Sequence, residues 1–373
     1  MRILFVSRAY PPVIGGIENQ NRDLALWLGK KADLRLIANT RGKTFLPIFL
    51  PYAFFKALIF SFSSDILLVG DGVLAPLAAA VGILHPGLKT AAVVHGLDLT
   101  FGRRPGFLSR FYRSVNLPSL RRLDRIFAVS GHTREVAIKS GIEPKRITVI
   151  RNGIDPSELV TSRRRDLLDR LVGVPTENRF VILRIGRYVE HKGVEWFIRN
   201  VVPKLPEKAL FVAAGSVVGK RTAGDNDYFP TCERTVGELG LDERVRLLTN
   251  LPQADILTLL NASDLAVSPN IPVPGTMEGF GINVIEANAC GLPVIAADLE
   301  GLTEAVQNGE NGTLIPPLDS DGFVAEIRRL MEDPGQLAER RKKASSYAAA
   351  TFHWNVLSDK YLEAFEEMLT SAS

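Results

Sequence analysis

Short apolar runs alternate with helix-length stretches along most of the chain, and this pattern constrains the fold more than any other feature. Such runs, apolar on both faces and separated by helical stretches, are typical of parallel sheets covered by helices. The sequence therefore predicts an α/β protein. The runs are RILFVS, DLRLIA, DILLVG, TAAVVHG, RIFAVS and ITVIRNG in a first set, then VILRIG, ALFVAAG, VRLLTN, LAVSP and PVIAAD in a second.

A charged stretch without strand pattern, from Asp155 to Arg179, separates the two sets. A chain of 373 residues is also too long for one ordinary core and suits two domains. We therefore expect an N-terminal Rossmann-like domain over 1–165 and a C-terminal Rossmann-like domain over 175–350. Parallel sheets bind ligands beyond the carboxyl ends of their strands, so the two domains should face each other across a central cleft.

The last part of the chain, 353–373, is expected to form an amphipathic helix. Val356, Tyr361, Phe365 and Met368 recur there near helical spacing. We expect this helix to pack back toward the N-terminal domain.

Composition and cysteine content favour a cytoplasmic protein. The first residues, MRILFVSRAYPP, lack the long apolar core and small-residue cleavage site of a secretory signal. No stretch reaches 18 uninterrupted apolar residues, so we expect no membrane-spanning helix. Cys232 and Cys290 lie far apart without the spacing of zinc ligands, which fits a reducing compartment.

The most informative stretch is EGFGINVIEANACGLPVI, from Glu278 to Ile295. Gly279 and Gly281 make a tight turn that leads into a helix, and a helix start binds anions through free N–H groups and the helix dipole. Glu278 lies in the turn, and Glu286 lies in the second helical turn. A carboxylate can accept hydrogen bonds from two neighbouring hydroxyls, as in a ribose or a sugar ring. The third glycine of a dinucleotide fingerprint is missing, so a nicotinamide cofactor is not favoured.

Three further strand ends carry candidate ligand groups. In RIGRYVEHKGVEWF, Arg187 and Lys192 flank a loop after a strand, and two cations there suit a diphosphate. In the first half, Gly16 follows the first strand in a close-approach loop suited to phosphate. The strand AAVVHG ends in His95, which could act at the site or be a satisfied core residue.

Together these pieces resemble the retaining nucleotide-sugar glycosyltransferases of family 4, which have the GT-B fold. The resemblance covers nearly the whole chain in the family's order. It rests on the EX7E pair inside GFGINVIEANACGLPVI and on PPVIGG, HG at His95, AVSGHTRE, RNGID, GRYVEHKG, GLTEAV and FHW.

The resemblance implies a role for each matched position. Arg187 and Lys192 would hold the donor diphosphate, and Glu286 would bind the ribose hydroxyls. Glu278 and the amides of three donor-binding residues would face the donor sugar; those residues are Phe280, Gly281 and Ile282. Gly16 would approach the phosphate, and His95 would contact the sugar from the opposite domain. The catalytic residues would thus be Glu278 and His95.

The reaction implied is transfer of a sugar from a UDP- or GDP-sugar to an acceptor hydroxyl, on one face of the sugar. The departing phosphate would help deprotonate the acceptor, so neither an enzymic nucleophile nor a metal or other cofactor is required. Polysaccharide or lipopolysaccharide biosynthesis is the expected setting, with a glycan or lipid-linked acceptor and no nucleic acid partner. Two alternatives stay open, another GT-B enzyme such as a nucleotide-sugar 2-epimerase and a non-catalytic sugar-nucleotide-binding scaffold.

Some features depart from the family pattern. An insertion, SVVGKRTAGDNDYFP, replaces a glycine-rich turn, and Asn250 stands where glycine is usual. The string DxD of metal-dependent transferases occurs at 225–227 and 319–321, which we interpret as solvated loops and not as metal sites.

Charge is distributed unevenly along the chain. Residues 1–160 hold 22 Lys and Arg against 11 Asp and Glu, whereas 161–373 hold 23 against 30. A basic segment, 101–146, follows soon after FLPIFLPYAFFKALIFSF at 45–62, with six phenylalanines and one charge. From Pro51 we expect a helix with Phe54, Phe55, Leu58, Ile59 and Phe62 on one face. We predict contact with an anionic membrane at its inner, cytoplasmic face and a lipid-linked or anionic acceptor, although the helix could also simply pack on the sheet.

Overall fold

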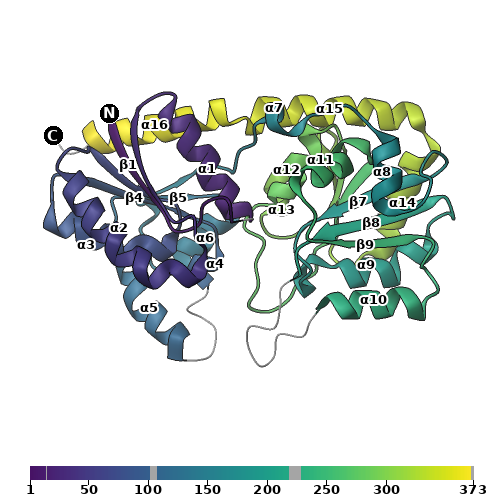
Figure 1. Cartoon of the computed structure of the whole chain (residues 1–373), viewed down its shortest axis with the longest axis horizontal. Helices are drawn as coiled ribbons and strands as arrows, with labels where there is room; N and C mark the ends of the chain where they lie inside the picture. The colour runs from purple at the N-terminus through teal and green to yellow at the C-terminus, as the bar shows by residue number, and fades with distance from the viewer. Residues whose placement is uncertain (14, 101–106, 218–227, 371–373) are drawn as a thin grey trace. The chain divides into compact units, whose positions relative to one another are not determined.

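The computed structural model describes residues 1–13, 15–100, 107–217 and 228–370 (Figure 1). Its internal contacts divide the chain into two compact units. The first unit comprises Met1–Ile154, Met277–Phe280 and Phe352–Ser373, and the second comprises Asp155–Thr276 and Gly281–Thr351.

The first unit is built on a parallel sheet in the order β2-β1-β3-β4-β5-β6. Buried aliphatic residues fill the central strands, since both faces are covered by helices. The strands are β1 (Arg2–Ser7), β2 (Asp33–Ala38), β3 (Ile66–Val69), β4 (Lys89–Val94), β5 (Arg125–Ala128) and β6 (Ile147–Val149).

Helices cover both faces of this sheet. The connection from β1 to β2 runs toward one edge of the sheet, and the later connections run toward the other edge. Because parallel crossovers are right-handed, α1 lies on one face while α2, α3 and α5 lie on the other. α16 packs beside α1, α2 beside α3, and α3 beside α5. The helices are α1 (Gly16–Gly29), α2 (Leu46–Ser61), α3 (Ala75–Leu84), α4 (Leu97–Thr100), α5 (Phe107–Leu120), α6 (Gly131–Lys139) and α16 (Trp354–Thr370), with 3-10 turns η1 (Lys43–Phe45), η2 (Gly72–Leu74) and η4 (Pro144–Arg146).

The second unit contains a parallel sheet in the order β12-β11-β10-β7-β8-β9. The strands are β7 (Phe180–Ile185), β8 (Ala209–Gly215), β9 (Val245–Thr249), β10 (Leu265–Ser268), β11 (Val294–Ala297) and β12 (Gly312–Ile315). The helices are α7 (Pro156–Leu159), α8 (Arg165–Val172), α9 (Val194–Asn200), α10 (Tyr228–Glu238), α11 (Gln253–Ala262), α12 (Ile282–Ala289), α13 (Leu302–Ala305), α14 (Ser320–Glu332) and α15 (Pro334–Phe352), with 3-10 turns η5 (Glu190–Lys192) and η6 (Val202–Lys204). All eleven predicted strands are present, and β12 is an addition.

The units differ in their limits from the domains expected from the sequence. The first long segment ends at Ile154 and not near 165, because α7 and α8 pack on helices of the second unit, against α12 and α11. α16 belongs to the first unit, where Tyr361, Phe365 and Met368 are buried. Val356, expected on the same face, is 41% exposed, and Leu357 is buried in its place.

Helix α2 also differs from expectation. It begins at Leu46, before Pro51, and its buried line is Phe49, Ala53, Ala57 and Ser61. Phe55, Ile59 and Phe62, predicted to share the apolar face with Phe54 and Leu58, are exposed. Among the described residues, one helical stretch, Lys43–Ser61, has the length and composition of a membrane-spanning segment. Counting uninterrupted apolar residues missed it, because Lys56 breaks the run.

Candidate functional site

The sheet of the second unit has a switch point between β7 and β10. These strands are neighbours, with Leu265 opposite Ile182 and Ala266 opposite Leu183, whereas the chain from β7 continues on the other side to β8. Open α/β sheets bind ligands beyond the carboxyl ends of the strands at such a point. The loops after β7 and β10 are therefore where a ligand of this unit is expected.

The loop after β7 carries the two predicted cations. Arg187 is exposed and Lys192 half-buried, at the end of turn η5. Gly193 follows with a φ of 69°, and a Cβ there would collide with the carbonyl oxygen of Pro269 in the loop after β10. The amide of Ile271 also donates to the His191 carbonyl at 3.0 Å. The two loops are thus in direct contact, and Lys192 is held beside the residues that follow β10.

Helix α12 begins at Ile282, and the segment from the end of β10 leads into it. Gly281 precedes it with a φ of 91°, where a Cβ would lie 2.7 Å from a Leu302 methyl group, so glycine is required on both grounds. The first N–H groups of a helix have no carbonyl partner within it and, with the dipole, favour an anion. Asn283, in the first turn of α12, donates its side-chain amide to the Ser268 hydroxyl at the end of β10, at 3.2 Å. The helix start and the Lys192 loop therefore both offer positive potential at one switch point.

Glu286 lies on α12, one turn beyond its start, and its side chain is half-buried. The helix is otherwise largely buried, through Val284, Ile285, Ala287, Asn288 and Ala289. Burial, with a contribution from the Glu286 charge, raises the pKa of the Cys290 thiol to about 12. Cys290 and Cys232 are both buried free thiols, as expected of packing residues.

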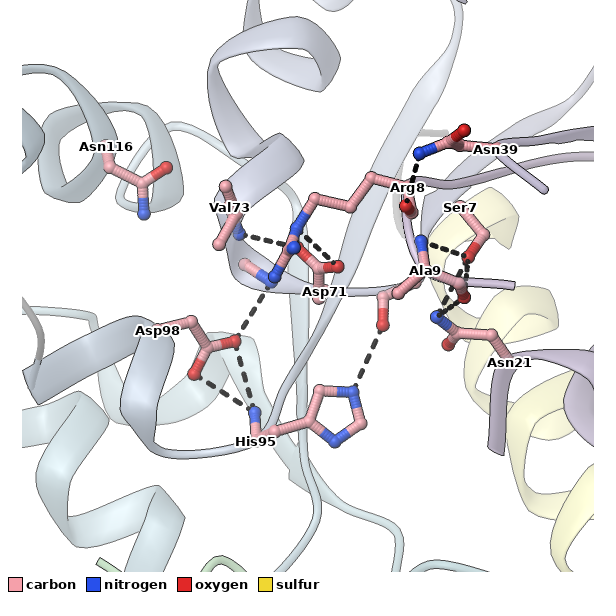
Figure 2. Close-up of polar contacts among 12 residues, drawn as sticks. Ser7, Arg8, Ala9, Asn21, Asn39, Asp71, Val73, His95, Asp98 and Asn116 are labelled. Carbon is pink, nitrogen blue, oxygen red and sulfur yellow. Dashed lines mark hydrogen bonds and ion pairs between the residues drawn. The ribbon is translucent and has the colours of Figure 1, made fainter. Parts of the chain in front are cut away.

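The first unit has its own switch point, between β1 and β3, where three strand ends are joined by polar contacts (Figure 2). Arg8, after β1, forms an ion pair of 2.9 Å with Asp71, after β3. Asp71 is 1% exposed. The carboxylate of Asp98 accepts hydrogen bonds from the backbone N–H groups of Gly72 at 3.0 Å, His95 at 3.1 Å and Gly96 at 2.8 Å.

Burial raises the pKa of Asp98, and repulsion from Asp71 adds to this effect. Tyr112 on α5 donates its hydroxyl to the Asp98 carbonyl oxygen at 2.7 Å, and burial also raises the pKa of Tyr112. The network fixes the loop that carries His95.

The imidazole of His95 has a defined hydrogen-bond pattern. Its Nε2 lies 3.1 Å from the carbonyl oxygen of Gly70. A carbonyl only accepts, so in the neutral ring Nε2 carries the proton and Nδ1 is the acceptor atom. The ring is half-buried, and Nδ1 could accept a hydrogen bond from a sugar hydroxyl.

The segment Met277–Phe280, distant in sequence, belongs to the first unit. A Cβ on Gly279 would collide with the His95 carbonyl oxygen, and one on Gly96 would lie within 3 Å of the Met277 side chain. The ring of Phe280 is buried against Phe352, with centroids 5.7 Å apart. Glu278 lies between Met277 and Gly279 in the chain, so its loop is held against the His95–Gly96 turn.

Gly16 is the first residue of α1 and is exposed. A Cβ on the preceding Gly15 would collide with the Glu18 carboxylate. A carboxylate already lies against this turn, which is unfavourable for a phosphate at the same place. Gly16 is therefore the least supported of the predicted ligand positions.

The predicted site residues thus form two groups, one in each unit. His95, Glu278 and Phe280 come together in the first unit, which also contains Gly16. The other predicted donor-binding residues lie in the second unit and are Arg187, Lys192, Gly281, Ile282 and Glu286. Sequence reasoning missed Arg8, Asp71 and Asp98. Each is a charged residue just after a buried strand or its turn, which is the signal that could have found them.

The features that depart from the family pattern have structural explanations where they lie in the described residues. Asn250 has a φ of 52°, a left-handed conformation that suits glycine and that asparagine tolerates. Asp319 accepts from the Gly322 amide at the start of α14, and Asp321 pairs with Lys204, so both carboxylates of this DxD string have structural partners. The other DxD string, at 225–227, and most of the insertion lie outside the described residues.

Comparison with solved structures identifies the fold. HepE from Anabaena, solved with UDP-glucose, matches with a TM-score of 0.78 over 98% of this chain and 100% of that chain, at 21–22% identity. The two parallel sheets with their switch-point loops and this likeness define a two-domain α/β protein of the GT-B fold.

Comparison with family models identifies the family. The model described as "Glycosyl transferases group 1" matches residues 170–351, and "Glycosyltransferase Family 4" matches residues 32–158. The chain belongs to the glycosyltransferases that these two models describe. This confirms the resemblance that was drawn from the order of the motifs.

Curated relatives of the chain include D-inositol 3-phosphate glycosyltransferases. One from Thermobispora bispora is 28% identical over 80% of this chain and 68% of that protein. Another, from Mycobacterium tuberculosis, is 31% identical over 63% of this chain and 47% of that protein. The match thus spans about half the length of the mycobacterial relative.

Proposed function

We propose that this protein transfers a sugar from a nucleoside diphosphate sugar to an acceptor hydroxyl with retention of anomeric configuration. The observation that carries the proposal is the convergence of the Lys192 loop and the start of α12 at the β7–β10 switch point. A diphosphate there meets two kinds of positive group, a side-chain cation and helix amides. Glu286, one turn along, is suited to the ribose hydroxyls.

Uridine is the nucleoside we favour for the donor. HepE, which shares the fold, was solved with UDP and with UDP-glucose. UDP and UDP-glucose are therefore the first ligands to test, with GDP and ADP compounds beside them.

The groups of the first unit would act on the sugar. His95 would accept a hydroxyl hydrogen bond at Nδ1, and Glu278 would bind the sugar from its turn. The leaving phosphate oxygen would take the acceptor proton as the new bond forms on the same face. No protein nucleophile and no metal enters this scheme, since Arg187, Lys192 and the α12 start would stabilise the charge that develops on the phosphate.

We further propose an anionic acceptor, either free or attached to a lipid. The relatives are named for D-inositol 3-phosphate, an anionic acceptor, and the first 160 residues carry twice as many Lys and Arg as Asp and Glu. Work at the inner face of a membrane, in polysaccharide or lipopolysaccharide synthesis, would follow from a lipid-linked acceptor.

The donor site is tested by titrating UDP and UDP-glucose into purified variants in a calorimeter. Lys192→Ala should weaken binding by about 10- to 100-fold, because a charge-assisted hydrogen bond contributes about 1.5–3 kcal/mol. Glu286→Gln should weaken binding of both ligands, since both contain the ribose.

Two exposed residues of the same unit provide matched controls. Lys204→Ala removes a cation paired with Asp321, and Glu310→Gln changes an exposed turn residue; neither should change affinity. If Lys192→Ala and Glu286→Gln bind as tightly as wild type, the assignment of this site is wrong.

A further inference from the structure

Helix α2 presents an unbroken line of large apolar side chains to solvent. Its members recur at spacings of three and four residues, which places them on one side of the helix. They are Ile48 (64% exposed), Tyr52 (53%), Phe55 (62%), Ile59 (64%) and Phe62 (71%). We call this line the α2 stripe.

The opposite side of α2 is packed on the sheet of the first unit. Phe49, Ala53, Ala57 and Ser61 are all within 2% of complete burial. The small alanines let the helix approach β1 and β2 closely. A helix that is apolar on all sides is normally surrounded by protein or lipid. Among the described residues, α2 contacts protein on its sheet side and along α3, and the side that carries the α2 stripe is exposed.

The apolar surface continues beyond α2. The Phe62 ring stacks on His85 at the end of α3, with centroids 4.9 Å apart, and the preceding residues Ile83 and Leu84 are 60% and 56% exposed. Contiguous apolar patches of this kind mark interaction sites.

The surroundings of the stripe are basic. Helices α2, α3 and α5 contain no Asp or Glu, and neither does the chain from 34 to 64. Lys56 lies over the rings of Tyr52 and Phe60, at 5.9 and 5.4 Å from their centroids, and Arg35 lies 4.3 Å from the Phe60 centroid. Arg110 and Arg113 on α5 are exposed. Cations beside an apolar stripe complement a surface that is apolar inside and anionic at its edge.

The topology excludes α2 from spanning a bilayer while this fold is kept. The helix joins β2 to β3, and both strands pair with β1 in one sheet. Its two ends are therefore fixed in the same layer of protein. The stretch Lys43–Ser61 has the composition of a spanning segment, but in this fold it can only lie flat against lipid.

We propose that the α2 stripe inserts in the plane of an anionic bilayer and docks the first unit on it. The rings and Ile side chains enter the interfacial region, while Lys56 and Arg35 stay at the level of the lipid phosphates. This proposal does not depend on the proposed glycosyl transfer. Phe55, Ile59 and Phe62 also belong to the face expected from the sequence, whereas Ile48 and Tyr52 take the place of Phe54 and Leu58. Arg103 and Arg104, which belong to the basic segment 101–146 expected to contact the membrane, lie outside the described residues.

Vesicle sedimentation with the full chain tests the proposal. We expect binding to phosphatidylcholine vesicles that contain phosphatidylglycerol, little binding to phosphatidylcholine alone, and weaker binding as salt rises. The double variant Phe55→Ser/Ile59→Ser should bind at least tenfold more weakly. Lys56→Ser should bind about fivefold more weakly, the factor expected for one cation at an anionic surface.

The controls separate docking from folding and from transfer. Val160→Ser changes a residue of the second unit that is 51% exposed and should bind vesicles like wild type. All variants replace exposed or half-buried side chains, so their thermal unfolding should match wild type. Because no nucleotide is used, docking can be observed even if glycosyl transfer is never found.

Three results would overturn the proposal. One is the absence of binding to anionic vesicles at low salt. Another is equal binding by wild type and the double variant. The third is a wild-type dimer that the double variant dissociates without any vesicle binding, because the stripe would then cover a second copy of the chain.

Discussion

Asp98 shows how one carboxylate can hold the candidate site of the first unit. It accepts three backbone N–H groups, from Gly72, His95 and Gly96. Asp98→Asn places an amide NH2 group among these donors and leaves at least one N–H group unpaired, at a cost of about 1–3 kcal/mol. We expect a fall of about 2–10 °C in the melting temperature by scanning calorimetry, together with lower turnover and unchanged affinity for UDP.

The matched control for this prediction is Asp359→Asn, which breaks the exposed ion pair with Lys31. Exposed pairs contribute about 0–1 kcal/mol, so this variant should melt close to wild type. An Asp98→Asn protein that melts and turns over like wild type would show that the three hydrogen bonds do not organise the site.

The sequence predicted site residues where particular residue types recur at the spacing of a motif. It did not predict single charged residues whose role depends on contacts with distant parts of the chain. Gly193 and Gly281 stand where the motifs place them, because a side chain would clash or strain the backbone at each. Asp71 and Asp98 belong to no repeat or helical pattern. Their position just after a buried strand or its turn is the one signal in the sequence, and it does not show which contacts they make. The Glu18 carboxylate beside Gly15 was also not foreseen.

Helix α16 supplies a test at the scale of elements. Phe365 is fully buried and makes an edge-to-face contact with Phe127 of β5, with ring centroids 5.5 Å apart. Phe365→Ala should lower the free energy of unfolding of the first unit by about 3–5 kcal/mol. Denaturant titration in a Trp196→Phe background, which leaves Trp27 and Trp354 as reporters in this unit, measures the change.

Val356→Ala is the control on the same helix, since Val356 is 41% exposed, and it should change the unfolding free energy by less than about 1 kcal/mol. A small effect of Phe365→Ala, similar to that of Val356→Ala, would mean that α16 does not stabilise the first unit.

Element identity was predictable, but the orientation of elements was less so. The strands were found because parallel strands buried on both faces leave continuous Val, Ile and Leu runs, whereas the four residues of β12, GTLI, are too short and too polar for this signal. The exposed face of α2 was predicted only in part, because a helix that is apolar all round carries no periodic signal. Phe55, Ile59 and Phe62 are exposed together, whereas Phe54 and Leu58 are half-buried. Ala53 and Ala57 face the sheet because their small side chains let the helix approach the strands closely.

For the molecule as a whole, the division into units could be predicted only approximately. The grouping of Met277–Phe280 with the first unit rests on contacts with residues far away in sequence, which composition does not encode. Family membership, by contrast, could be inferred from the order of the motifs.

Metal independence is a prediction about the whole enzyme. Side-chain cations and a helix start would supply positive charge to the leaving group, the role that a metal has in other transferases. Turnover should persist in EDTA, measured as nucleoside diphosphate release. Turnover that EDTA abolishes and manganese restores would contradict this scheme.

Product analysis tests whether the protein carries out acceptor-dependent transfer from a nucleoside diphosphate sugar. Wild type and Lys192→Ala are incubated with UDP-, GDP- and ADP-sugars, alone and with anionic acceptors such as D-inositol 3-phosphate and lipid phosphates. We expect wild type to release nucleoside diphosphate, and to form an equal amount of glycosylated acceptor, only when both substrates are present. Lys192→Ala should do so far more slowly. Conversion of the donor to its C2 epimer without acceptor, or binding of donor with no product from any pair, would contradict acceptor-dependent transfer.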